Sequence, residues 1–287
     1  MTRAYKAIQT AYAGKLRGTD IANLLGMVPF ALRMHGRGAA EIADGVAVQC
    51  ARLMMQTMAG CIGFLGKKRG FVPREPGESL AAHVLRAAGA KRTPDALFAV
   101  NGALTVLTDN ELAPATFAAR VAALTHADLF NCIAAAIGSH VGFSTGTATE
   151  KVETVPLRDI TSTDSAARLR LVREYGASLF GFNHPLYPDG DARANLILAQ
   201  VRALRQSTSA TAPTLEFLAV VEKKLGTRTG VAIALVTLAR ALGLPDGTAT
   251  ALWIISRTAG WVAHVLEQRA QALLLPPHAK YIAGSRL

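Results

Sequence analysis

The chain has 287 residues, of which 51% are hydrophobic and 6% aromatic, and its formal net charge is +11. This length suits one large domain or two modest ones, and a composition led by alanine and leucine favours closely packed helices. No apolar run reaches the roughly 20 residues needed to span a bilayer, and the first 15 residues lack the apolar core of a secretory signal. We therefore expect a cytoplasmic protein that does not enter a membrane.

The basic excess suits a phosphorylated or carboxylate ligand, an acidic partner or simply a solubilising surface. Nucleic acid is not expected, because the sequence has neither a basic stripe interleaved with aromatic residues nor a zinc-finger spacing. Cys50, Cys61 and Cys132 each lie in an apolar run without the spacing of metal ligands. We predict three buried free thiols in a reducing compartment and no metal site.

Apolar side chains at three- and four-residue spacing predict helices throughout the chain. In chain order, the predicted helices span residues 39–63, 94–107, 114–125, 126–141, 159–180, 192–205, 215–225, 230–242 and 248–275. Glycines, prolines and basic residues predict a solvated loop at 66–77, and a Gly/Ser/Thr run predicts a hinge or ligand-facing loop at 142–149. No alternating pattern long enough for a strand occurs, so the predicted class is all-α.

A stiff loop between two predicted helices carries the clearest candidate site. Residues 180–194 read FGFNHPLYPDGDARA. Gly181 and Asn183 tolerate unusual backbone angles, and two prolines stiffen the segment. Such a loop holds the imidazole of His184 and the guanidinium of Arg193 at a fixed separation, which suits a carboxylate or a carbonyl oxygen. The alternative is a surface turn with a half-buried histidine.

Three segments resemble motifs of the citrate synthase family and occur in the family's order. The loop resembles the signature GFGHxxYxxxDPRA, in which Asn183 replaces a glycine and Ala192 a proline. Residues 256–268 (SRTAGWVAHVLEQ) resemble ARTxGWxAHWxEQ, and residues 111–120 (ELAPATFAAR) resemble ELNxSTFAAR. The resemblance runs over residues 95–268 and is faint nearer the N-terminus.

The resemblance implies an all-α, citrate synthase-like fold of two domains. A large helical domain would comprise residues 1–150 and 248–287, and a smaller helical domain, residues 151–247, would be inserted between them. The active site would lie in the cleft and close by domain rotation. Family members are homodimers, so the regions around Ala134 and Ala251 would lie near an interface.

The family's chemistry implies roles for individual residues. An aspartate removes a proton from acetyl-coenzyme A, one histidine donates to the enolate oxygen, and another polarises the ketone of a keto acid. The resemblance assigns ketone polarisation to His184 and carboxylate binding to Arg193 and Arg257. The coenzyme A thioester would be a substrate, and no permanently bound cofactor is implied.

Four positions that carry this chemistry depart from the family pattern. Leu107 and Asn110 replace histidines, Thr145 stands at the position of the enol donor, and Glu216 stands at the position of the base. Asn110 can still donate to a carboxylate, whereas Leu107 has no polar group. Thr145 offers a single hydroxyl. Glu216 keeps a carboxylate, and its alternative role is a charge on a solvated helix face.

The sequence is therefore compatible with two main functions. The first is an enzyme that condenses an acyl-coenzyme A with a keto acid such as oxaloacetate, weakly on its own, because each lost preorganised donor costs about 10²–10³ in rate. The second is a catalytically degenerate subunit that pairs with an intact citrate synthase for structure or regulation. A third and weaker reading is a cleavage like that of citryl-coenzyme A lyase, which the missing histidines also disfavour.

Overall fold

A computed structural model describes residues 16–34, 46–142, 148–158, 160–161, 163, 165–184, 186–205 and 211–271. Within these residues the fold contains twelve α-helices and no strand, which confirms the predicted all-α class. The helices are α2 (Ile21–Leu32), α4 (Ala47–Cys61), α5 (Leu80–Ala88), α6 (Pro94–Val106), α7 (Pro114–Leu124), α8 (Leu129–His140), α9 (Ala148–Thr154), α10 (Ser165–Tyr175), α11 (Ala192–Ala203), α12 (Thr211–Leu225), α13 (Val231–Ala241) and α14 (Thr248–Gln271).

Helices with clear sequence signals lie close to their predicted positions. Helices α6, α7, α8, α11 and α13 begin and end within three residues of the prediction. Thr93 caps the start of α6 by accepting a hydrogen bond from the backbone N–H of Ala96 at 3.2 Å, and Pro94 occupies the first turn.

Other boundaries differ from the prediction. The helix predicted at 159–180 breaks at Gly176, whose φ of 90° a residue with a side chain rarely adopts. Helix α12 begins four residues before the predicted start at 215, and α9 begins inside the predicted loop at 142–149. Most of that loop lies outside the described residues.

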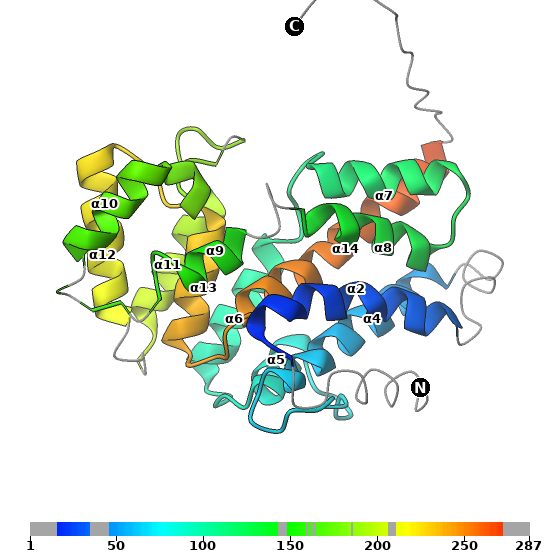
Figure 1. Cartoon of the computed structure of the whole chain (residues 1–287). Helices are drawn as coiled ribbons and strands as arrows, with labels where there is room; N and C mark the ends of the chain where they lie inside the picture. The colour runs from blue at the N-terminus through cyan, green and yellow to red at the C-terminus, as the bar shows by residue number, and fades with distance from the viewer. Residues whose placement is uncertain are drawn as a thin grey trace, which may run out of the picture.

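Helix α14 is the helix around which many of the others pack (Figure 1). It packs against α2, α4, α6, α7, α8 and α13. Its first half is buried on nearly every side, and Gly260 is needed there because a Cβ would collide with the backbone carbonyl of Thr108. Helices α9 to α13 lie together on the other side of the molecule in Figure 1, with α13 joining them to α14. The division into domains at residues 151–247 stays a prediction.

Two of the family-like segments meet at a polar seam between α7 and α14. Arg120 donates to Gln268 at 2.8 Å and to Glu267 at 2.5 Å, and it lies 3.2 Å from Nδ1 of His264. These contacts join residues almost 150 positions apart in the chain. The seam gives Arg120 and the Glu-Gln pair a structural role, separate from any chemistry.

The three cysteines are buried, as the sequence predicts. Cys50, Cys61 and Cys132 are buried free thiols. Burial raises the pKa of Cys61 to about 12, which disfavours its reactive thiolate form. The described part of the chain holds no cluster of three or more candidate metal ligands, and none of its helices is long and apolar enough to cross a membrane.

A buried carboxylate ties α9 to the turn before α14. Glu153 is 7% exposed, and its Oε2 accepts a hydrogen bond from the backbone N–H of Gly247 at 3.0 Å. Burial raises the pKa of Glu153 to about 7 and is the largest effect. The Gly247 bond and Arg240 act to lower this pKa, whereas Asp246 and Glu150 add to the increase. The native state therefore keeps a proton that the unfolded chain releases above pH 4.5.

We expect stability to fall by about 2–3 kcal/mol between pH 5 and pH 8 through this one group. Glu153→Gln cannot ionise and should not show this loss. The free energy of unfolding of the variant minus that of the wild type should therefore be about 2–3 kcal/mol larger at pH 8 than at pH 5. Urea denaturation at pH 5 and pH 8 measures this difference, with Glu216→Gln on an exposed site as the control. An equal effect of Glu153→Gln at both pH values would contradict the prediction.

Candidate functional site

The His184 loop borders a cavity of about 550 Å³. Its walls come from the α6–α7 connection, the end of α8, the start of α13 and the buried half of α14. The lining residues are 110–116, His140, Ala148, Ser178, 181–184, Leu186, 230–232, Trp253, Arg257 and Trp261. Segments from six parts of the chain, the start of α9 included, thus converge on one site.

Hydrogen bonds to the segment before α13 position the loop. The backbone N–H of Asn183 donates to the carbonyl of Arg228 at 2.8 Å, and the N–H of Arg228 donates to Oδ1 of Asn183 at 2.7 Å. The N–H of Gly230 donates to the carbonyl of Gly181 at 3.0 Å. Asn183 adopts a left-handed φ of 56°, which asparagine tolerates. Asparagine thus fits where the family motif has glycine, and its side chain adds a bond that anchors His184.

The hydrogen bonding of His184 defines its tautomer. Nδ1 accepts a hydrogen bond from the backbone N–H of Leu186 at 3.2 Å, so the proton of the neutral ring is on Nε2. Burial lowers the pKa of His184, and the charge of Arg193 lowers it further. The ring also packs against Tyr187, with centroids 5.1 Å apart. His184 is therefore a neutral imidazole that can donate a hydrogen bond from Nε2.

Arg257 lies in the wall of the same cavity and is 1% exposed. Its guanidinium donates to the carbonyl of Thr108 and, at 2.8 Å, to Oγ1 of Thr116. Burial lowers the pKa of Arg257 to about 10, so the group is still protonated at neutral pH. Among the described residues, no carboxylate forms an ion pair with it. A buried cation with only neutral acceptors suits a bound anion.

His140 and two tryptophans form an aromatic part of the wall. The His140 ring meets Trp253 and Trp261 edge-on, with centroid distances of 5.3 and 5.7 Å. Burial lowers the pKa of His140 to about 4, with a further contribution from Arg257, so this imidazole is neutral at pH 7. Sequence reasoning missed His140, because a single histidine at the end of an apolar helix carries no motif.

Arg193 sits beside the cavity and is not among the residues that line it. It donates to both carboxylate oxygens of Asp191 at 2.9 Å, to Oδ1 of Asn110 at 2.8 Å and to the carbonyl of Asp109 at 3.1 Å. Its guanidinium also lies 4.6 Å from the ring centre of Tyr187. These contacts tie the loop to residue 110, which does line the cavity. Direct contact of Arg193 with a substrate stays a prediction.

Two of the positions that depart from the family pattern lie away from the cavity. Glu216 is exposed on α12, whose buried face carries Phe217, Leu218 and Val221, and it is absent from the cavity lining. This position matches the alternative of a charge on a solvated face, and the role of Glu216 as the base stays a prediction. Leu107 is fully buried in the core. Thr145 lies outside the described residues.

A second cavity, of about 480 Å³, also borders His184. Asn183 and His184 line both cavities, and this one adds Pro188, Asp189, Gly226 and Arg228. The exposed guanidinium of Arg228 makes it a place where an anionic group can approach His184 from another direction.

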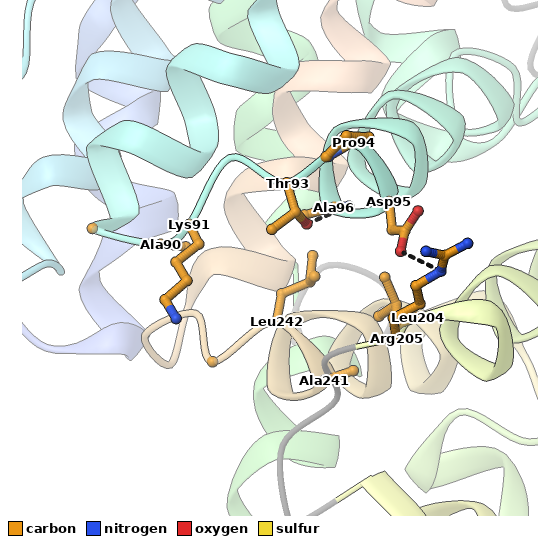
Figure 2. A pocket seen from close by; sticks show the side chains of 12 residues that line it. Ala90, Lys91, Thr93, Pro94, Asp95, Ala96, Leu204, Arg205, Ala241 and Leu242 are labelled. Atoms are coloured by element: carbon orange, nitrogen blue, oxygen red, sulfur yellow. Dashed lines mark hydrogen bonds and ion pairs between the residues drawn. The ribbon is translucent and has the colours of Figure 1, made fainter.

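A third and larger cavity, of about 680 Å³, lies at the opposite end of α6 (Figure 2). Exposed Lys91 borders it on one side, and an ion pair of 3.9 Å between Arg205 and Asp95 borders it on the other. Its lining contains no histidine, cysteine or buried charge. The smaller cavity at His184 is therefore the better candidate for chemistry.

Comparison with known proteins gives matches over most of the chain. The family model described as the citrate synthase C-terminal domain matches residues 15–278. Citrate synthase 2 of Bacillus subtilis is 32% identical over 75% of this chain and 59% of its own length. The 2-methylcitrate synthase of Shewanella oneidensis is 28% identical over 72% of this chain and 56% of its own length. The chain thus spans less than two thirds of the curated relatives it matches.

Solved structures share the fold. Citrate synthase from Thermoplasma acidophilum, in a ternary complex with carboxymethyl coenzyme A and oxaloacetate, aligns with a TM-score of 0.80 and 23% identity over all of this chain and 78% of that one. Citryl-CoA lyase from Hydrogenobacter thermophilus aligns with a TM-score of 0.62 and 20% identity over 74% of this chain and 87% of that one.

Proposed function

Because the chain belongs to the citrate synthase family, we propose that its cavity binds a keto dicarboxylate such as oxaloacetate and condenses it, slowly, with an acyl-coenzyme A. The buried guanidinium of Arg257 carries this proposal. It faces the cavity without a carboxylate partner among the described residues, so the negative charge it lacks is best supplied by a ligand.

The cavity offers three donors for such a ligand. Arg257 binds one carboxylate, and Nε2–H of His184 donates to the ketone oxygen and withdraws electron density from the carbonyl carbon. Asn110 uses its Oδ1 to accept from Arg193, which leaves its amide nitrogen to donate to the second carboxylate. The neutral state of His184 suits this role, because the ketone needs a positioned donor.

The acyl-coenzyme A approaches from the second cavity in this proposal. His184 and Asn183 stand between the two cavities, so a thioester entering beside Arg228 reaches the carbonyl that His184 holds. Coenzyme A is polyanionic, and Arg228 together with the net charge of +11 favours its capture.

We expect this protein to bind a dicarboxylate but to catalyse the condensation only slowly. Oxaloacetate or citrate well above its dissociation constant should stabilise the fold by about 1–3 kcal/mol through mass action, as a thermal-shift titration would measure. Release of the coenzyme A thiol should be far slower than in a typical family member, because Leu107 and Asn110 replace donors. An unchanged melting temperature would refute the binding site, and ordinary turnover by this chain alone would refute the slow rate.

The exposure of Glu216 favours one second candidate. A subunit that keeps the keto-acid site but lacks a base at that position could bind a dicarboxylate and pair with an intact citrate synthase. Co-purification with such a paralogue, together with ligand binding and no turnover by the chain alone, would support this role over the enzymatic one. Assembly as a homodimer is the matching expectation for the enzyme.

A further inference from the structure

Condensation requires a base that reaches the cavity, since the α-carbon of the acyl thioester must lose a proton before it can attack a ketone. Glu216 is exposed on α12 and does not line the cavity. Glu111 is also exposed, but it does line the cavity, and it is the one carboxylate among the described lining residues.

Of the other carboxylates around the His184 loop, Asp191 and Asp109 already accept hydrogen bonds, and Asp189 lines only the second cavity. Both oxygens of Asp191 accept hydrogen bonds from Arg193 at 2.9 Å, and that carboxylate is almost completely buried. Asp109 uses Oδ1 to accept the backbone N–H of Glu111 at 3.0 Å, and it does not line the cavity. The carboxylate of Glu111 makes no hydrogen bond or ion pair with any described residue. It is therefore available to take up a proton.

The charge of Glu111 acts on two residues of the His184 loop. Its negative charge acts to raise the pKa of both His184 and Tyr187. The backbone of Glu111 has a left-handed φ of 47°, which is unfavourable for a residue with a side chain, and the bond to Asp109 holds it there. The chain thus maintains an uncommon conformation at the residue that brings a carboxylate to the cavity.

On the basis of the proposed function, we propose that Glu111 is the general base that removes the α-proton of the acyl thioester. The carboxylate of Glu111 takes the proton, and the resulting enolate carbon forms a bond to the ketone carbon of the keto acid. The electron pair of the broken C=O π bond moves to the ketone oxygen, which takes a proton from Nε2 of His184. Glu111 returns its proton to solvent, His184 regains one, and water hydrolyses the thioester to release the coenzyme A thiol.

Hydrogen–deuterium exchange at the acetyl group tests this step separately from condensation. The wild type, Glu111→Gln and Glu216→Gln are incubated in D₂O with acetyl-coenzyme A and malate, a dicarboxylate that lacks the ketone, and deuterium uptake is followed by mass spectrometry. Glu111→Gln should lower exchange at least about 100-fold, the usual contribution of a general base. Glu216→Gln should exchange within about twofold of the wild type, and Glu111→Asp should restore part of the rate.

Thermal shifts with oxaloacetate distinguish the base from the binding site. Glu111→Gln keeps the left-handed backbone position and the bond to Asp109, so it should fold and still be stabilised by oxaloacetate. Exchange that survives in Glu111→Gln, or that is lost in Glu216→Gln, overturns the role of Glu111 and leaves the binding site intact. Absence of exchange in a wild type that oxaloacetate stabilises also overturns that role. Absence of any oxaloacetate effect in the wild type overturns the proposed function itself.

Discussion

Replacing Arg257 with alanine is expected to abolish the stabilisation that oxaloacetate or citrate gives to the fold. A hydrogen bond to a charged group contributes about 1.5–3 kcal/mol, so dicarboxylate binding should weaken about 10- to 100-fold. The effect should be large because Arg257 is buried in the cavity wall and no described carboxylate competes with a ligand for it. Isothermal titration with oxaloacetate measures the change directly.

Two further variants separate binding from folding. Arg257→Lys keeps the positive charge but loses the planar fork that matches a carboxylate, so it should recover only part of the affinity. Lys91→Ala removes an exposed cation from the cavity in Figure 2 and should leave dicarboxylate binding unchanged. Affinity equal to the wild type in a folded Arg257→Ala protein would mean that the cavity is not the anion site.

Replacing His184 with alanine is expected to lower kcat for thiol release by about 10²–10³, the usual effect of losing one preorganised donor. The loss should appear in kcat more than in KM, because the bond from Nε2 strengthens as negative charge develops on the ketone oxygen. Burial lowers the pKa of His184, so its protonation state should not change between pH 7 and pH 8. The factor by which His184→Ala lowers kcat should therefore be the same at both pH values.

A matched histidine variant controls for the loss of an imidazole. His126 is exposed and has a left-handed φ of 57°, which asparagine also tolerates, so His126→Asn should leave kcat unchanged. His184→Gln retains an N–H donor at a similar reach and should keep more activity than His184→Ala. Equal rates for the wild type and His184→Ala would show that another group polarises the ketone.

Helix positions were predictable where the signal is local. The prolines at the starts of α6 and α7 and the three- and four-residue apolar spacing are properties of neighbouring residues, and they located these helices to within a few positions. The loop of His184 was predictable for the same reason. Gly181 and Asn183 both have the left-handed backbone angles that their residue types suggested.

The side chains that share the cavity were less predictable. Glu216 matched a motif by its type, but contacts of its neighbours with other helices decide which face of α12 is buried. Arg193 was predicted to bind a substrate, and its contacts with Asp191 and Asn110 depend on how the loop meets the end of α6. Each outcome depends on tertiary packing, which residue spacing along the chain does not encode.

The wall formed by His140, Trp253 and Trp261 makes the site optically distinct. These are the only two tryptophans in the sequence, and both line the same cavity. The guanidinium carbon of Arg257 also lies over the ring of Trp261, 5.6 Å from the centre of that ring. All tryptophan emission of this protein therefore arises at the wall of the proposed anion site. The intrinsic fluorescence is a reporter of site occupancy that needs no attached dye and no coupled enzyme.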